Sequence, residues 1–354
     1  MSLASKIKRV MLKPILRMVQ RLNDGQHDYR ELRLSIARID RWLSVDIPEL
    51  MRSTLVLENC TATWFDLPHT RPEQVILYLH GGGFIFETPG LHAGMLARFC
   101  RDTGARGLML NYRLAPEFPY PAATDDCLAA YRHLLDIGYA ADKIVIAGDS
   151  AGGNLTLVTL LRTREAGLPL PAGAIALSPL TDATGASDSF VRNEKHDPMF
   201  TANTYKLVMD NYLPDVARRS EPWASPLFGN LDGLPPIHLV VGSSEMMLDE
   251  AVRFACKCPS ATLDVWHDMP HVFPAMSFLP EAQQALVRLA LCFNAMFSGA
   301  TSLDTLLNRP AASIVSPGDE SSAGALRFYP TTTTLGLTLM GLAAIAAVVA
   351  VYYS

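Results

Sequence analysis

Short apolar runs alternate with helix-like stretches along the middle of the chain, between about residues 75 and 298. Six of the runs are apolar without a clean alternation of hydrophobic and polar positions, which is typical of strands covered on both faces. These predicted strands are residues 75–80, 107–112, 143–150, 172–178, 237–242 and 263–267. Helical patterns lie between most of them. This order predicts an α/β fold with a mostly parallel central sheet and helices on both faces.

The end of the chain is apolar throughout. Arg327 is the last charged side chain, and residues 335–353 read LGLTLMGLAAIAAVVAVYY. At about 1.5 Å per residue, a helix of this length would extend about 28 Å, which is close to the hydrocarbon thickness of a bilayer. A terminal helix of a soluble core should be amphipathic, whereas this segment is apolar on every face. We therefore predict a transmembrane tail anchor with the rest of the chain facing the cytosol; the endoplasmic reticulum is one candidate membrane. A lipid-anchor signal cleaved near residues 321–324 is the alternative.

The first 60 residues and residues 300–334 have compositions of their own. Residues 1–21 interleave six basic side chains with apolar ones, without the uninterrupted apolar stretch of a secretory signal peptide. This pattern favours a basic amphipathic helix, either a cap on the central domain or a helix resting on an anionic membrane surface. Residues 1–60 are thus predicted to form basic and cap helices, and residues 61–299 the main domain. Residues 300–334, rich in Ser, Thr, Ala, Pro and Gly, are predicted to be a flexible linker.

Composition narrows the function classes. The 354 residues are 49% hydrophobic and 18% charged, with a formal net charge of −5. This charge argues against a general nucleic-acid binder, which must neutralise many phosphates. The six cysteines include no C-x-x-C pair and no cluster with zinc spacing, so no metal site is predicted. Reduced core thiols are the favoured interpretation, with a disulfide as the alternative.

The segment KIVIAGDSAGG, residues 143–153, joins a buried strand to a helical pattern through the run Gly148-Asp149-Ser150-Ala151-Gly152. This G-x-S-x-G pattern is a nucleophile elbow when a strand precedes it and a helix follows it. The two glycines allow the tight turn, and the helix N-terminus beside Ser150 favours negative charge. The sequence therefore indicates Ser150 as a nucleophile.

A second glycine run, His80-Gly81-Gly82-Gly83, also follows a predicted strand. Backbone N–H groups of Gly82 and Gly83, together with that of Ala151, are suited to bind a developing oxyanion. Glycine is needed there because a substrate carbonyl must approach the backbone closely. His80 is interpreted as a brace of this loop and not as a base.

In α/β hydrolases the nucleophile is followed first by the acid and then by the base. Two histidines come late enough, and His271, in the loop after the strand at residues 263–267, is preferred over the strand-end His267. After the strand at residues 237–242, both Glu245 and Asp249 are candidates for the acid that orients the imidazole.

With these motifs the chain resembles the hormone-sensitive-lipase-like esterases, in the branch that carries the GDSAG motif. The match extends from about residue 77 to residue 273. Besides the two glycine motifs, it rests on segments that read YRLAPE (residues 112–117), SPL (225–227), LPP (234–236) and MPHVF (269–273). The acid of the family is usually the first Asp of a D-P-L-x-D motif, where this chain has Glu245 and then Asp249, so Glu245 takes its place and Asp249 remains the alternative.

The resemblance implies an α/β-hydrolase fold with a helical cap, no cofactor, and hydrolysis of carboxylic esters. It assigns the nucleophile to Ser150, the base to His271 and the oxyanion hole to Gly82, Gly83 and Ala151. An insertion at residues 182–223 would add to the cap, and its aromatic and Met side chains would favour small to medium lipophilic esters as substrates. The alternative is a non-catalytic protein that binds a small ligand on the same fold.

Overall fold

The computed structural model describes residues 29–43, 47, 49–277, 279–307 and 326–329. Its centre is a nine-stranded sheet in the order β1-β2-β4-β3-β5-β6-β7-β8-β9. β2 pairs antiparallel with β1 and with β4, and every other neighbouring pair is parallel. The strands are β1 (Met51–Val56), β2 (Thr61–Asp66), β3 (Arg71–Leu79), β4 (Ala105–Asn111), β5 (Ile144–Asp149), β6 (Gly173–Leu177), β7 (Ile237–Gly242), β8 (Ala261–Trp266) and β9 (Leu326–Tyr329).

The four central parallel strands explain why the apolar runs lack alternation. Every residue of β5, β6, β7 and β8 is buried, because helices cover both faces of the sheet there. All six strands expected from the sequence are present, although their ends shift by a few residues. The predicted α/β architecture with a mostly parallel sheet is confirmed.

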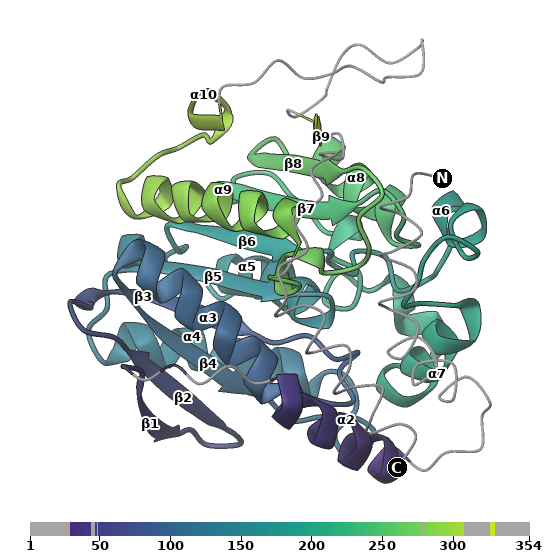
Figure 1. The fold of residues 1–354 in the computed structure, drawn as a ribbon, viewed down its shortest axis with the longest axis horizontal. Helices are drawn as coiled ribbons and strands as arrows, with labels where there is room; N and C mark the ends of the chain where they lie inside the picture. Colours follow the sequence, from purple (N-terminus) through teal and green to yellow (C-terminus); the bar gives the residue numbers. More distant parts are fainter. Residues whose placement is uncertain (1–28, 44–46, 48, 278, 308–325, 330–354) are drawn as a thin grey trace.

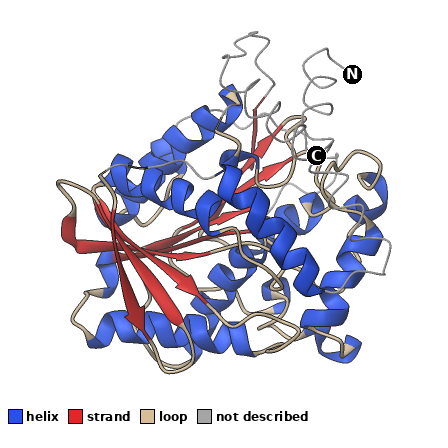
Figure 2. Cartoon of the chain, turned by 60° about the horizontal axis from the view of Figure 1, so that its bottom comes forward, coloured by secondary structure: helices blue, strands red, loops and turns tan. Residues whose placement is uncertain are grey.

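Helices form two layers around the sheet, as Figure 1 shows. α3 (Pro89–Thr103) and α9 (Pro280–Phe297) lie together on one face. The other face is covered by α4 (Ala122–Asp136), α5 (Ala151–Glu165) and α8 (Leu248–Lys257). The red strands of Figure 2 twist between these two blue layers.

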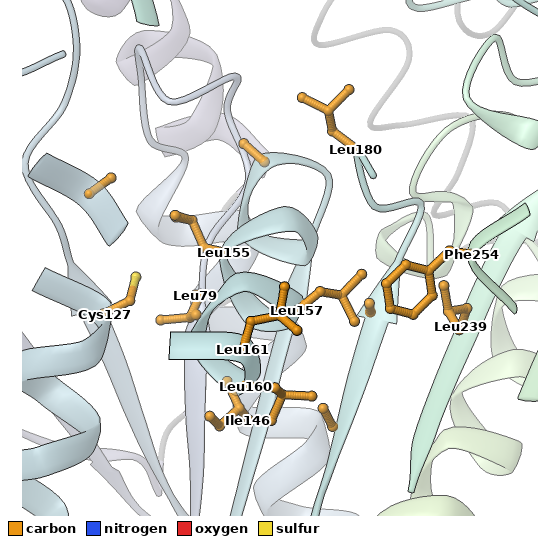
Figure 3. Close-up of a cluster of buried hydrophobic side chains, with 14 of the residues drawn as sticks. Leu79, Cys127, Ile146, Leu155, Leu157, Leu160, Leu161, Leu180, Leu239 and Phe254 are labelled. Carbon is orange, nitrogen blue, oxygen red and sulfur yellow. The ribbon is translucent and has the colours of Figure 1, made fainter. Parts of the chain in front are cut away.

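Each layer has its own hydrophobic core. Figure 3 shows the core beneath α5, where Leu157 and Leu160 lie among side chains from the sheet, such as Ile146 and Leu239, and from α8, such as Phe254. The core on the opposite face joins α3 to α9. Because these two cores hold the strands from both sides, the loops at the carboxyl ends of the strands rest on a fixed base.

Both flanking segments contain elements that the sequence did not indicate. Residues 1–60 are not helical throughout, since β1 adds an antiparallel edge strand at Met51–Val56, where the exposed side chains conceal the strand from a search for apolar runs. The predicted flexible linker at residues 300–334 contains α10 (Asp304–Leu307) and β9, which pairs with the free edge of β8. Free strand edges offer unpaired backbone groups, so a short β-prone segment such as LRFY finds partners there.

The predicted tail anchor and the basic N-terminal pattern lie outside the described residues. Among the helices of the described ranges, none combines the length and apolar composition that a bilayer crossing requires. None of the six cysteines, all of which lie in the described ranges, forms a disulfide bond.

Three helices lie at the carboxyl ends of the parallel strands, where Figure 1 shows them beyond the arrowheads. They are α2 (Tyr29–Leu43), α6 (Asp188–Arg192) and α7 (Ala202–Tyr212). We call these helices and the loops between α6 and α7 the cap. The cap thus combines a segment that precedes the sheet with one inserted between β6 and β7.

α2 is attached to the main domain through the first turn of α3. The carboxylate of Asp40 accepts hydrogen bonds from the backbone N–H groups of Gly90 at 2.6 Å and Leu91 at 2.9 Å. Thr88, the N-cap residue of α3, makes no capping bond with its own side chain. Asp40, on a different helix, therefore caps the N-terminus of α3, and its negative charge also suits that position.

Replacing Asp40 with Ala should lower the free energy of unfolding by about 1 to 2 kcal/mol, the usual cost of a lost N-cap. The measurement is a urea unfolding curve, in which the midpoint should fall. Arg38→Ala, at an exposed position of the same helix, is the control and should leave the midpoint in place. Equal midpoints for the two variants would contradict the capping role.

Candidate active site

Ser150 lies at the turn between β5 and α5, at the carboxyl edge of the sheet. Its backbone has φ 55° and ψ −118°, a strained conformation for a residue with a side chain. Glycines on either side make the turn feasible. A Cβ on Gly152 would lie 1.9 Å from the carbonyl oxygen of Leu79, and one on Gly148 would lie 2.4 Å from that of Gly152. Only glycine therefore lets the helix start this close to the strands, and this approach sets the direction of the Ser150 side chain.

The second glycine motif forms a tight loop after β3. Gly82 has φ 115° and Gly83 has φ 59°, both in the region that favours glycine. The carbonyl oxygen of Gly82 accepts hydrogen bonds from the N–H groups of Ile85 and Phe86. We call residues 80–86 the glycine loop. Gly83 lines the same pocket as Ser150 and Ala151, so the glycine loop and the elbow meet there.

Asp149, beside the serine, connects the elbow to the glycine loop. Its Oδ1 accepts hydrogen bonds from the hydroxyl of Tyr78 at 2.6 Å and from the N–H of Gly81 at 3.0 Å. Its Oδ2 lies 3.3 Å from Nε2 of His92. Burial alone would raise the pKa of Asp149, but the charge and hydrogen bond of His92, with that of Tyr78, outweigh burial and hold the pKa below its usual value. The carboxylate therefore stays charged and fixes the position of Gly81.

His92 was not expected from the sequence, because it lies within a helical pattern and belongs to no motif. Burial lowers its pKa, but the charge and hydrogen bond of Asp149 outweigh burial, so the pKa is raised overall. His80 differs: burial lowers its pKa to about 4, so it is neutral near pH 7. Its Nδ1 lies 2.7 Å from the Gly81 carbonyl oxygen, and its own carbonyl oxygen accepts the hydroxyl of Tyr112. His80 thus braces the glycine loop from within, and His92 holds Asp149, which binds that loop through Gly81.

His271 and Glu245 form a hydrogen-bonded pair at the ends of neighbouring strands. His271 follows β8 and Glu245 follows β7, and parallel neighbours bring their carboxyl ends to the same edge. Nδ1 of His271 lies 2.8 Å from Oε2 of Glu245, and both residues are buried. Nε2 of His271 has no hydrogen-bond partner among the described residues. When Nδ1–H donates to the carboxylate, Nε2 is the basic nitrogen of the ring.

The other oxygen of Glu245 is also fully engaged. Oε1 accepts hydrogen bonds from the N–H of Gly242 at 2.5 Å and from the hydroxyl of Ser178 at 2.8 Å. The same hydroxyl accepts a hydrogen bond from the N–H of Val272, next to His271. Ser178 thus joins the loop of the acid to that of the histidine. Its place directly after the strand β6 was the only signal for it in the sequence.

The environment of His271 favours its protonated form. Burial lowers its pKa, but the hydrogen bond and charge of Glu245, followed by the charges of Asp197 and Asp149, outweigh burial and raise the pKa above the ordinary 6.5. A proton taken up by this imidazole is therefore well stabilised.

Asp249, the alternative acid, faces elsewhere. Its carboxylate accepts hydrogen bonds from the N–H of Ser189 at 2.9 Å and from the guanidinium of Arg192 at 2.6 Å, both in or beside α6. It is the second residue of α8, so the helix directs it toward the cap. His267 is exposed and pairs with its neighbour Asp268. The structure thus brings Glu245, and neither of these residues, to His271.

An apolar pocket opens beside Ser150. The cap contributes four of its side chains, and the main domain contributes Leu180 and Met247 next to the elbow and glycine loop. The four cap residues are Phe200, Tyr205, Val208 and Met209. Val208 lies so close to the glycine loop that a Cβ on Gly83 would be 2.9 Å from it. The ring of Phe200 also packs edge-on against His271, with 4.7 Å between ring centroids. The described residues include no group of three or more His, Cys, Asp or Glu side chains suited to a metal ion.

Comparisons with known proteins agree with this geometry. A family model described as the alpha/beta hydrolase fold matches residues 76–275. An esterase of Acinetobacter venetianus is 36% identical over 239 residues, which are 65% of this chain and 76% of the relative. An acetyl-hydrolase of Streptomyces hygroscopicus is 36% identical over 233 residues, which are 64% of this chain and 77% of the relative.

Solved structures show the same relationship. The crystal structure of an esterase from the bacterial hormone-sensitive lipase family superposes with a TM-score of 0.75 at 35% identity, covering 81% of this chain and 98% of that one. The chain belongs to the hormone-sensitive-lipase-like esterases of the α/β-hydrolase fold. The resemblance inferred from the motifs is thereby confirmed, and with it the expectation of an enzyme of the carboxylesterase and lipase type.

Glu245→Gln should reduce kcat for an ester substrate by about 10³-fold or more, because an amide can no longer stabilise the imidazolium or hold the required tautomer. Asp249→Asn should change kcat only slightly, since Asp249 contacts the cap and not His271. Steady-state hydrolysis by the two purified variants decides between them. A larger loss from Asp249→Asn would reject Glu245 as the acid.

Proposed function

We propose that this enzyme hydrolyses small to medium lipophilic carboxylic esters through Ser150, His271 and Glu245. The observation that carries the proposal is the buried pair of His271 and Glu245 at the sheet edge from which Ser150 projects. Phe200, which contacts His271 and also lines the pocket beside Ser150, connects the pair to that pocket. An imidazole with one nitrogen held by a carboxylate and the other without a partner is suited to take a proton from a serine hydroxyl.

The reaction would proceed in two halves. Ser150 attacks the ester carbonyl while His271 takes the hydroxyl proton, and the resulting imidazolium is stabilised by Glu245. His271 then donates that proton to the oxygen of the departing alcohol, which leaves an acyl group on Ser150. Water, deprotonated by the same imidazole, attacks the acyl-enzyme and releases the acid.

The oxyanion would be bound by backbone N–H groups of Gly82, Gly83 and Ala151. Three features support this assignment: the glycine loop and α5 meet at the pocket, Gly83 and Ala151 both line it, and Asp149 ties Gly81 to the elbow. Donors fixed in advance need no reorganisation as negative charge develops, which makes this a large contribution to catalysis.

The pocket supports a lipophilic substrate. Its side chains are almost all apolar, and such a lining favours an apolar acyl or alcohol group over a charged one. The names of the two curated relatives, an esterase and an acetyl-hydrolase, support an ester as the reacting group.

Ser150→Ala should abolish measurable hydrolysis of p-nitrophenyl butyrate, because the nucleophile is lost while the glycine loop remains. A fluorophosphonate probe should label the native enzyme and not the variant. Native protein that neither hydrolyses the ester nor reacts with the probe, but still binds small apolar ligands, would instead support the alternative of a non-catalytic binding protein.

We also propose that residues 335–353 anchor the enzyme in a membrane, with the catalytic domain facing the cytosol. The support is the sequence alone: a charge-free apolar segment about as long as a bilayer is thick. Such tethering would give the pocket access to lipophilic esters dissolved in the membrane.

The full chain should therefore sediment with cell membranes, and a chain ending at Asn308 should remain in the soluble fraction. Alkaline carbonate washing distinguishes an inserted segment from a peripheral one, which would be released. Equal amounts of both chains in the soluble fraction would reject the anchor.

A further inference from the structure

A buried carboxylate of the cap, Asp197, makes three hydrogen bonds to backbone N–H groups and belongs to none of the motifs. It lies between α6 and α7, with 8% of its surface exposed. Its Oδ2 accepts from the N–H of Met246 at 2.8 Å. Its Oδ1 accepts from the N–H groups of Met199 at 2.8 Å and Phe200 at 3.0 Å. A carboxylate is costly to bury unless its oxygens are bonded, and here they are.

Asn193, also in the cap, binds the same part of the main domain. Its side-chain amide donates to the carbonyl oxygen of Glu245 at 2.7 Å and to that of Ser243 at 3.1 Å. The carbonyl of Glu245 and the N–H of Met246 belong to one peptide group. Asn193 therefore holds this peptide at its oxygen while Asp197 holds it at its nitrogen.

The position of the peptide group between Glu245 and Met246 determines the position of Cα of Glu245, from which its side chain extends. The main domain orients the far end of that side chain, through Gly242 and Ser178. The cap orients the backbone end of the same side chain, through Asn193 and Asp197. Asp197 also holds the backbone of Phe200, whose ring packs edge-on against His271. The carboxylate of Asp197 thus binds the backbone next to Glu245 and also the backbone of the residue that packs against His271.

We propose that Asp197, together with Asn193, is a positioning residue for the Glu245–His271 pair, so that the cap builds the catalytic acid's geometry as well as the pocket wall. This proposal rests on the function proposed above. In this arrangement, a shift of the cap segment between α6 and α7 displaces Glu245. The rate of the chemical step therefore depends on the position of that segment relative to the main domain.

The charge of Asp197 gives the proposal an electrostatic signature. The charged groups that act on His271 are Glu245, Asp197 and Asp149, and each raises the pKa of the imidazole. Burial raises the pKa of Asp197 itself to about 6, against the opposing effect of His271. Since catalysis needs the neutral imidazole, kcat/KM falls as the pH drops through the pKa of His271. Removing the negative charge at residue 197 should lower that pKa and move the fall to lower pH.

The test is Asp197→Asn in the full chain, assayed with p-nitrophenyl butyrate across pH 5 to 9. In one orientation the N–H₂ group of the new amide faces the N–H of Met246 and cannot accept its hydrogen bond. In the other orientation the N–H₂ group faces Met199 and Phe200, and those two hydrogen bonds are lost. We expect kcat to fall about 10-fold or more with little change in KM, because a small misplacement of catalytic groups is costly in rate. The acid limb of kcat/KM should move to lower pH. Asp188→Asn, at an exposed carboxylate of the same cap segment, is the matched control and should change neither quantity.

Asn193→Ala provides a second, uncharged variant. It should lower kcat in the same way while leaving the acid limb of the pH profile in place. In the double variant, the loss of kcat should be smaller than the two single losses combined, because both residues bind one peptide group. Active sites are counted by fluorophosphonate titration, so kcat refers to folded enzyme. The midpoint of the pH profile does not depend on how much of the sample is folded.

Native kcat and an unmoved acid limb in Asp197→Asn would overturn the proposal. If that variant does not fold, native kcat in Asn193→Ala would overturn it equally. Failure of the proposed function is a separate result: it appears as undiminished hydrolysis in Ser150→Ala, whatever the cap variants do.

Discussion

The carbonyl oxygen of Leu79, at the end of β3, lies so close to the first turn of α5 that a Cβ on Gly152 would come within 1.9 Å of it. This contact requires glycine, and it fixes where α5 begins relative to the sheet. The strained conformation of Ser150 follows, because the chain must reverse between a buried strand and a helix pressed against it. The two hydrophobic cores hold strand and helix together strongly enough to sustain that strain.

Three buried carboxylates of the candidate site, Asp149, Glu245 and Asp197, each accept hydrogen bonds from backbone N–H groups. Asp149 holds the glycine loop through Gly81, Glu245 is held by Gly242, and Asp197 reaches from the cap to Met246. A buried charge without partners would cost several kcal/mol, so each carboxylate requires its loop to adopt one arrangement. The same bonds that satisfy the charges therefore position the backbone that forms the site.

The sequence predicted the elements whose signal is local. Buried parallel strands such as β5 and β7 are continuous apolar runs, and the two glycine motifs have few other structural uses when each follows a strand. Strands at the margin of the sheet were missed. β1 is exposed along most of its length, and β9 is short, so neither shows the apolar pattern of a buried strand. These strands form because a neighbouring edge offers hydrogen-bond partners, which is a property of the assembled sheet.

By itself, the sequence determined the fold class, the nucleophile candidate and the chain order in which a base and an acid must follow, because glycine requirements and apolar runs are properties of a few adjacent residues. It left Glu245 and Asp249 as alternatives, since they are four residues apart and chemically alike. Only the tertiary structure shows which of the two contacts His271. α8 begins at Leu248, so its first turn directs Asp249 toward Arg192, while Glu245 stays in the loop where β7 and β8 end side by side and His271 lies within hydrogen-bonding distance.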